Sequence, residues 1–595
     1  MMTSGKLHYL TDLFNLVMMK RLFTAVLVLM AMAGPAASQS IVPAEWKFLT
    51  GNREEYIDSA KNDYWWNDIS PLTVWEKQGF AGYDGFAWYR VKVVVPGSMK
   101  KNALKYGGLM LNLGKIDDAD ETWFNGHLVG RTGKMPPGYI GAYNVPRSYL
   151  IPPEYIRWNG KNTIAVRVYD AGGDGGLWGG PVELTNRGNP DLLTLGTAFD
   201  EEDMILTGSP DVEIPVTVKS EFRKKYRGAL SLEIVTDFGE KFHQGYREVA
   251  VKANSTGRFI FRVTGLKPGF YRAVVTLESK MGNKKHSFNF GYEPEKIVSP
   301  ADAQPDFAGF WQRAKAELAS VDPQYRLIRI DSLCTERYNV YLVEMRSLGN
   351  ALIRGWYQVP AKPGRYPAIM QVPGYSSVEL PSYINYGDDV IGFGLNIRGH
   401  GNSRDDVNPG FPGYILTSLA DKEKYIYRGA YMDCVRGIDF LCSRPEVDAT
   451  RIAVEGASQG GALTFATAAL ASDRIAVCAP QVPFLSDFRD YFRVATWPAN
   501  EFIDLVENKK ALTWDQVYNT LSYFDIKNLA PMIKAPVIMG VGLMDDVCPP
   551  HINFAAYNLV TAEKKYIVYP QAGHGLPEHF WHAKMEWIRN HLGLK

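Results

Sequence analysis

Residues 451–470 read Arg-Ile-Ala-Val-Glu-Gly-Ala-Ser-Gln-Gly-Gly-Ala-Leu-Thr-Phe-Ala-Thr-Ala-Ala-Leu, and this stretch decides the fold of the C-terminal half of the chain. Its first five residues have the apolar character of a buried strand, and its last ten resemble a helix. The five residues between them, 456–460, fit the pattern Gly-x-Ser-x-Gly, in which a serine occupies a sharp turn from strand to helix. Flanking glycines give the room that this strained backbone and the close packing of helix on strand require. The stretch therefore predicts that Ser458 is a nucleophile, and not part of a plain glycine-rich turn.

The segment around this unit alternates strands with helices. Strand-like runs occupy residues 368–372, 390–397, 535–541 and 566–570, and helix-like runs occupy residues 306–318, 428–441 and 583–592. Such alternation implies a mostly parallel sheet with helices on both faces. We therefore expect an α/β domain of the hydrolase type over residues 300–595, with its reactive groups at the carboxyl ends of the strands.

A serine nucleophile needs a histidine to take its proton and an acid to hold that histidine in one tautomer. In α/β-hydrolases the acid and then the histidine follow the serine along the chain. His579, His582 and His591 fall on or near the last helix, whereas His574 lies in the loop Gln-Ala-Gly-His-Gly at 571–575, just past a strand. The sequence therefore predicts His574 as the base.

The acid and the oxyanion hole are sought in two further loops. The loop at 542–550 contains the adjacent Asp545 and Asp546, and their position after a strand does not show which of the two is the acid. An oxyanion hole needs two backbone N–H groups, one from the residue after the nucleophile, which is Gln459, and one from the loop after an earlier strand. That loop reads Pro-Gly-Tyr-Ser at 373–376, and because proline has no N–H, Tyr375 is the predicted second donor.

The segment resembles carbohydrate esterase family 7, the acetyl xylan esterases and cephalosporin C deacetylases. The resemblance runs from Asp-Phe-Ala-Gly-Phe-Trp at 306–311 to the C-terminus. Its most specific motifs are Tyr-Ile-Tyr-Arg-Gly-Ala-Tyr-Met-Asp at 425–433, the Gly-x-Ser-Gln-Gly-Gly turn, Leu-Ser-Tyr-Phe-Asp-Ile-Lys-Asn-Leu-Ala at 521–530, Gly-Leu-Met-Asp at 542–545, and Arg-Gly-His-Gly-Asn-Ser at 398–403, which looks like the family's Arg-Gly-Gln-type motif.

The resemblance implies an acetyl esterase without cofactor or metal, acting on an acetylated carbohydrate through Ser458, His574 and Asp545. It is the resemblance that places the family's acid on Asp545. The chain departs from the family at Pro373, where histidine is usual, and at Gly575, where glutamate is usual. Both departures alter the pocket rim, so the acetyl specificity carries over less firmly than the chemistry. Family members often form rings, which implies a homo-oligomer unless the N-terminal half covers that surface.

Residues 39–196 read as an all-β domain. Alternating strands at 88–96, 109–113 and 163–169, with an Asn-Gly turn at 125–126, resemble the galactose-binding-like jelly roll. Four tryptophans could stack on sugar rings, although filling the sandwich or an interface is the favoured interpretation: Trp65, Trp66, Trp75 and Trp178. Four acidic residues could hold calcium, although a solvated turn is favoured: Asp117, Asp118, Asp120 and Glu121.

Residues 197–296 carry alternating strands that suggest an immunoglobulin-like sandwich, for which a spacer is the simplest role. Residues 1–38 contain Met-Lys-Arg at 19–21, an apolar run at 22–32 and Ala-Ala-Ser at 36–38, which predict a signal peptide cleaved near Ser38 and a secreted or periplasmic protein. No later apolar run is long enough to span a bilayer. The five cysteines are odd in number and irregularly spaced, which disfavours a disulfide framework or a zinc site.

The chain has 595 residues and a net charge of +1, so its overall charge gives no case for binding nucleic acid. The whole sequence predicts a multidomain serine esterase that removes acetyl groups from plant polysaccharides or oligosaccharides. Two alternatives remain. One is a peptidase of the prolyl-oligopeptidase type, which shares the fold, the order of the triad and appended β domains. The other is a non-catalytic carbohydrate-binding protein.

Overall fold

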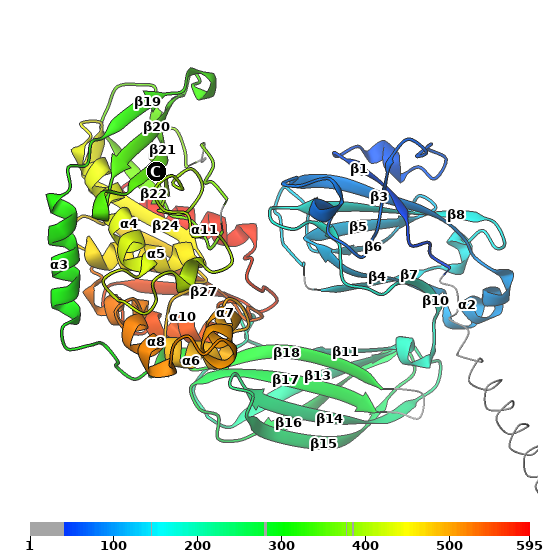
Figure 1. The fold of residues 1–595 in the computed structure, drawn as a ribbon. Helices are drawn as coiled ribbons and strands as arrows, with labels where there is room; N and C mark the ends of the chain where they lie inside the picture. The colour runs from blue at the N-terminus through cyan, green and yellow to red at the C-terminus, as the bar shows by residue number, and fades with distance from the viewer. Residues whose placement is uncertain (1–40, 144, 279–282, 377, 383–385, 595) are drawn as a thin grey trace, which may run out of the picture.

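The computed structural model describes residues 41–143, 145–278, 283–376, 378–382 and 386–594. The expected signal peptide lies outside the described residues. Two β-sandwiches are followed by an α/β domain, which confirms the predicted multidomain class. In Figure 1 the second sandwich lies below both the first sandwich and the α/β domain.

The first sandwich is all-β and occupies the segment where the jelly roll was expected, and we call it the jelly roll. One sheet has the order β2-β1-β3-β8-β5-β6, and the other has the order β10-β4-β7 with β9 paired to β4. Asn125 and Gly126 both have positive φ, as the predicted hairpin turn between β5 and β6 requires. The strands are β1 (Trp46–Thr50), β2 (Asn67–Ile69), β3 (Gly85–Val94), β4 (Leu109–Asp117), β5 (Ala119–Phe124), β6 (His127–Thr132), β7 (Pro146–Ile151), β8 (Lys161–Asp170), β9 (Gly176–Leu177) and β10 (Val182–Asn186), and the helix α2 spans Lys100–Tyr106.

Half of the questioned tryptophans and acids of this domain are buried, and only Trp65 among them is exposed. Trp66 and Trp75 are only 3% and 0% exposed, so they fill the sandwich as favoured above, whereas Trp65 stays in solvent. The acids do not form the solvated turn that was favoured. Asp120 forms a fully buried ion pair with Arg147, at 2.9 Å. Asp117 and Asp118 instead meet Asp170, with one oxygen of each within 4.8 Å of the others.

The second sandwich packs directly on the α/β domain. Its sheets have the orders β11-β13-β16 and β12-β18-β17-β14-β15. Phe270 of β17 lies 5.6 Å from Phe554 of the α/β domain between ring centroids, and one apolar cluster spans both domains. The domain begins with β11, before the boundary expected at residue 197. Its strands are β11 (Leu193–Thr197), β12 (Ile205–Leu206), β13 (Val212–Ser220), β14 (Tyr226–Thr236), β15 (Lys241–Val251), β16 (Ser255–Val263), β17 (Gly269–Glu278) and β18 (Lys284–Tyr292).

The α/β domain is built on a nine-stranded sheet of order β19-β20-β21-β23-β22-β24-β25-β26-β27. The pairs from β19 to β23 are antiparallel, and the pairs from β23 through β22 to β27 are parallel. The strands are β19 (Arg326–Arg329), β20 (Tyr338–Arg346), β21 (Leu352–Pro360), β22 (Tyr366–Gln371), β23 (Ile391–Asn396), β24 (Val447–Ala457), β25 (Val477–Gln481), β26 (Val537–Gly542) and β27 (Lys564–Tyr569).

Helices cover both faces of this sheet, as predicted. Along β22, Ala368 and Met370 join the apolar cluster that contains α3, α4 and α5, whereas Ile369 between them joins the cluster of α11. Burial on both faces explains why the parallel strands read as continuous apolar runs. No helix in the described ranges is long and apolar enough to cross a membrane. The helices are α3 (Phe307–Ser320), α4 (Ile426–Ser443), α5 (Gln459–Leu470), α6 (Phe488–Val494), α7 (Ala499–Ile503), α8 (Trp514–Leu521), α9 (Ile526–Leu529), α10 (Pro550–Tyr557) and α11 (Glu578–His591).

Candidate active site

Ser458 stands at the turn between β24 and α5, as the opening stretch predicted. Its backbone has φ 59° and ψ −121°, a conformation that residues other than glycine rarely adopt. A Cβ on Gly456 would lie 2.7 Å from the backbone of Gly460, and one on Gly460 would lie 2.5 Å from the carbonyl oxygen of Val372. Only glycine therefore fits at these two positions, and the turn holds Ser458 at the carboxyl end of the sheet.

The predicted base and acid meet at the ends of β27 and β26. Nδ1 of His574 lies 2.9 Å from Oδ2 of Asp545. The other oxygen of Asp545 accepts the backbone N–H groups of Val547 and Cys548, both at 2.9 Å. Asp545, and not its neighbour Asp546, therefore contacts the histidine, and three hydrogen bonds fix the orientation of its carboxylate.

The charge state of His574 is set by two opposing effects. Burial alone would lower its pKa, because an imidazolium loses hydration. The charge of Asp545 and the hydrogen bond to it, together with the charge of Asp546, outweigh burial and raise the pKa of His574 above its usual value. The histidine is thereby stabilised in the protonated form that accepting a proton from a serine would produce.

The side chain of Ser458 contacts the thiol of Cys548. Burial raises the pKa of Cys548 well above its usual value, so the thiol is neutral. Ser458 and His574, both of which the structure describes, form no hydrogen bond with each other. The sequence indicated no role of its own for Cys548, and the one signal for its position was its place three residues after Asp545.

The side chain of Gln459 supports the predicted oxyanion loop. Its Nε2 donates to the carbonyl oxygen of Gly374 at 3.1 Å, and its Oε1 accepts from the hydroxyl of Tyr427 at 2.6 Å. Nε2 also lies 2.9 Å from Nε2 of His400, whose pKa burial lowers to about 4, so that ring is neutral. The main-chain N–H of Gln459 is the first of α5, and the first N–H groups of a helix have no acceptor within the helix.

Arg398 and Asp433 link two of the motifs on which the resemblance rests. The guanidinium of Arg398 forms a two-pronged ion pair with the fully buried carboxylate of Asp433 on α4, at 2.8 and 2.7 Å. The carbonyl of Arg398 lies 3.3 Å from Nδ1 of His400. The ion pair thus anchors the segment that carries His400 against Gln459.

Tyr375 is anchored in an aromatic wall. Its hydroxyl accepts the N–H of Ile415 at 3.2 Å and donates to Glu501 at 3.3 Å. Its ring lies 4.9 Å from that of Phe411 and 5.5 Å from that of Trp497. The Trp497 side is open, with 41% of this residue exposed. The preceding residue, Thr496, donates its N–H to the carbonyl of Asp546, so the wall is joined to the loop of the acid.

Both N-terminal domains reach the loops that carry the acid and the base. Asn289 of the second sandwich donates to the carbonyl of Leu543 at 2.7 Å. In the jelly roll, the hydroxyl of Tyr143 lies beside the backbone of Gly573 and His574. Burial, then the charges of Asp546 and Asp545, raise the pKa of Tyr143 to about 12. Sequence reasoning missed both contacts, because no local pattern marks residues that meet from different domains.

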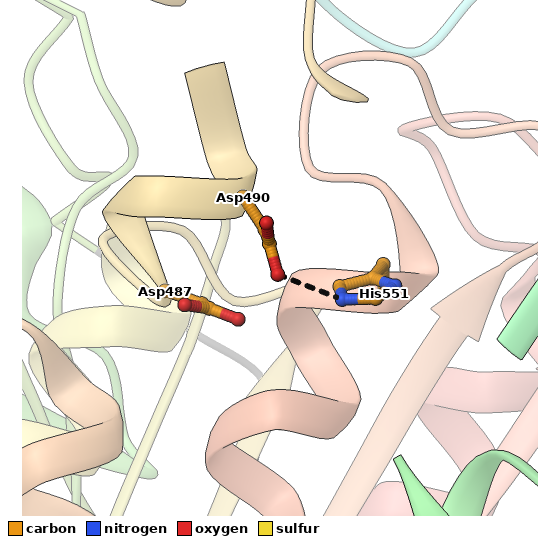
Figure 2. Close-up of side chains that lie close together, drawn as sticks. All are labelled: Asp487, Asp490 and His551. Carbon is orange, nitrogen blue, oxygen red and sulfur yellow. Dashed lines mark ion pairs between the residues drawn. The ribbon is translucent and has the colours of Figure 1, made fainter. Parts of the chain in front are cut away.

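His551, which also follows Ser458 in the sequence, belongs to a separate cluster. Figure 2 shows its ring facing Asp490, with Asp487 beside them. Nδ1 of His551 lies 2.8 Å from Asp237 of the second sandwich, and Nε2 lies 3.5 Å from Asp490. Burial would lower the pKa of His551, but these two carboxylates raise it to about 9. A histidine that is charged at neutral pH cannot serve as a general base, which agrees with the choice of His574.

Asp487 in this cluster also faces a cation. Its Oδ1 lies 2.9 Å from Nζ of the buried Lys527. The three residues of Figure 2 bring ligand-type atoms within 4.8 Å of one another. Because Asp487 is paired with Lys527 and Asp490 with His551, ion pairs account for the arrangement.

Comparison with known proteins places the α/β domain among esterases. The family described as "Acetyl xylan esterase (AXE1)" matches residues 293–591, which is half of the chain. The acetyl esterase Axe7A of Xylanibacter ruminicola is 29% identical over 341 residues, covering 55% of this chain and 75% of its own.

Two solved structures are similar to the same half. The acetyl xylan esterase 1 of a Thermoanaerobacterium species is 31% identical, covers 50% of this chain and 97% of its own, and has a TM-score of 0.47. The acetyl xylan esterase of Paenibacillus sp. R4 is 32% identical, covers 50% of this chain and 98% of its own, and has the same TM-score of 0.47. The match of the family over half of the chain is decisive: the protein belongs to the acetyl xylan esterase family of carboxylic ester hydrolases.

Proposed function

We propose that this protein is a serine esterase that removes acetyl groups from plant polysaccharides or oligosaccharides, with Ser458, His574 and Asp545 as its triad. The observation that carries the proposal is the hydrogen bond of 2.9 Å between His574 and Asp545, at the strand ends where the turn of Ser458 also lies. The names of the relatives, acetyl xylan esterase and acetyl esterase, support acetyl as the acyl group. Export, which residues 1–38 predict, would bring such an enzyme to polymeric substrates.

The reaction begins with proton transfer from Ser458 to Nε2 of His574 as Oγ attacks the acetyl carbonyl carbon. Because Ser458 and His574 form no hydrogen bond in this structure, the hydroxyl of Ser458 has to approach Nε2 of His574 for this step. Asp545 stabilises the imidazolium that forms. A positioned base of this kind contributes about 10²–10⁴-fold to the rate.

The tetrahedral intermediate carries a negative oxygen, which the N–H groups of Gln459 and Tyr375 stabilise. One such donor is worth about 10²–10³-fold in kcat. His574 then protonates the sugar oxygen, the carbon–oxygen bond to the sugar breaks, and the acetyl group remains on Ser458. Water, deprotonated by His574, attacks this acyl-enzyme, acetate leaves, and the proton returns to Ser458.

Trp497 is the side chain best placed to hold the sugar. Its ring is partly exposed and packs against Tyr375. The residue before it, Thr496, is hydrogen-bonded to the loop that carries the acid. An aromatic ring with one open side offers the flat apolar surface on which a sugar ring can stack. We therefore place the sugar next to Trp497 and the acetyl group next to Tyr375.

The test is acetate release by the purified protein and by Ser458→Ala, from acetylated xylan, acetylated pectin, short acetylated xylooligosaccharides and 4-nitrophenyl acetate. Loss of all turnover in the variant is expected, and turnover retained by it would rule out the triad. Cleavage of proline-containing peptides but not of acetyl esters would favour the peptidase alternative. Failure of a serine-directed phosphonate to label Ser458 would favour a non-catalytic protein.

A further inference from the structure

We propose that the jelly roll completes the esterase site: its loop between β6 and β7 forms the wall beside the base, and Tyr143 on this loop is a positioning residue for His574. This inference rests on the proposed function. It gives the N-terminal domain a role in the reaction, in place of a role confined to binding carbohydrate at a distance.

The first observation is the contact between Tyr143 and the loop that carries the base. The hydroxyl of Tyr143 lies beside the backbone of His574. It also lies 3.0 Å from the position that a Cβ on Gly573 would occupy. A side chain at 573 would therefore press on the ring of Tyr143, so the glycine before the base is matched to the tyrosine from the other domain.

The second observation is that the base loop is also held by the acid loop. The N–H of Met544 donates to the carbonyl of Ala572 at 2.9 Å. A Cβ on Gly542 would lie 2.2 Å from the carbonyl oxygen of Gly573, so these two loops are in backbone contact. Because the acid loop and Tyr143 both contact it, the backbone that carries His574 has little freedom to move.

The third observation is that the jelly-roll loop is anchored at both domains. On the esterase side, Glu578 accepts the N–H of Tyr139 at 2.7 Å, and the N–H of Glu578 donates to the carbonyl of Tyr139 at 3.1 Å. On its own side, the buried Arg147 donates to the carbonyl of Ala142 at 2.6 Å. Lys134 and Ile140 exchange two backbone hydrogen bonds at 2.9 Å, which hold the loop together from residue 134 to residue 140.

The chemistry indicates which part of the substrate the loop faces. His574 delivers its proton to the leaving sugar oxygen, so the groups beside the base lie on the leaving-group side of the ester. Tyr143 therefore stands on the sugar side of the ester, and not on the side of the acetyl methyl group. The loop should matter most for substrates whose alcohol is a poor leaving group that needs a well-placed proton.

Tyr143→Phe tests this, because it removes the hydroxyl and keeps the ring. We expect kcat for an acetylated xylooligosaccharide to fall about tenfold, the size of one lost polar contact, with KM nearly unchanged. For 4-nitrophenyl acetate, whose leaving group needs no proton, kcat should fall less than threefold. Glu578→Ala, which removes the side-chain anchor of Tyr139, should shift the two substrates in the same unequal way. Tyr64→Phe, an exposed tyrosine of the same domain, is the matched control.

The outcomes separate this inference from the function on which it rests. If the wild-type protein releases acetate and Tyr143→Phe has the wild-type kcat on both substrates, the inference is wrong and the proposed esterase function stands. Equal losses on both substrates together with a lower Tm would assign Tyr143 to stability alone, and would also overturn it. A wild-type protein that releases no acetate from any ester would overturn both proposals.

Discussion

Oδ2 of Asp545 lies 2.9 Å from Nδ1 of His574, while Oδ1 of the same carboxylate accepts the N–H groups of Val547 and Cys548. The two backbone bonds leave the carboxylate one orientation, and in it the second oxygen faces the imidazole. A carboxylate held in this way fixes both the tautomer and the tilt of the histidine. Asp546, the next residue, makes no such bond to His574 among the described residues.

This relationship predicts that the two adjacent aspartates differ sharply. In Asp545→Asn the amide can donate to Nδ1, which favours the wrong tautomer, and kcat for an acetyl ester should fall about 10⁴-fold. In Asp546→Asn kcat near pH 8 should stay within about threefold, because only a neighbouring charge is lost. Steady-state kinetics of both variants provide the measurement. Equal losses in the two variants would contradict the assignment of the acid.

The raised pKa of His574 predicts the acidic limb of the pH profile. A general base must be neutral, so kcat/KM should rise with pH through the pKa of His574 in the free protein. Because Asp545 and Asp546 raise this pKa, the midpoint should lie above about 6.5, the usual value for histidine. Asp546→Asn removes one raising charge and should move the midpoint to lower pH. A midpoint below 6 in the wild-type protein would contradict the electrostatic account.

Most of the candidate site could be predicted from the sequence, because its residues belong to local motifs or follow one another in a known order along the chain. The turn at Ser458 needs only a strand, flanking glycines and a helix in succession, and the place of His574 in a loop just past a strand separated it from the histidines of the last helix. Asp545 and Asp546 could not be separated by spacing, since the N–H groups of Val547 and Cys548 decide between them. That choice depends on the path of the folded loop.

The remaining contacts join distant parts of the chain, and no local pattern could reveal them. Tyr139 and Glu578 are 439 residues apart in the sequence, and Asp237 and His551 are 314 apart. The expected solvated turn at residues 117–121 was wrong for a related reason. Arg147, which pairs with Asp120 in the interior, follows it by 27 residues. A run of acidic residues is predicted to be exposed to solvent when the buried cation that pairs with it cannot be identified from the sequence.

The ion pair of His551 predicts how stability depends on pH. Its pKa is about 9 in the folded protein and near 6.5 when unfolded, so the folded state holds its proton more tightly. The stabilisation, of the order of 3 kcal/mol, is fully present below about pH 6.5 and is lost as the pH rises toward 9. Thermal melts from pH 6 to 9.5 should show a fall in Tm that is smaller in His551→Gln and in Asp237→Asn. An identical pH dependence in all three proteins would contradict this role.

Trp497 gives the prediction that connects the site to its carbohydrate. Trp497→Ala removes the open ring beside Tyr375 and should raise KM for acetylated xylooligosaccharides about five- to tenfold, as loss of one stacking contact of about 1 kcal/mol implies. The same variant should leave kcat/KM for 4-nitrophenyl acetate within about threefold, because that substrate has no sugar. Trp497→Phe keeps a ring against Tyr375 and is the matched control, with an intermediate KM expected. If Trp497→Ala lowers kcat equally on both substrates, the ring serves to hold Tyr375 and its N–H in the oxyanion hole, and the sugar must bind elsewhere.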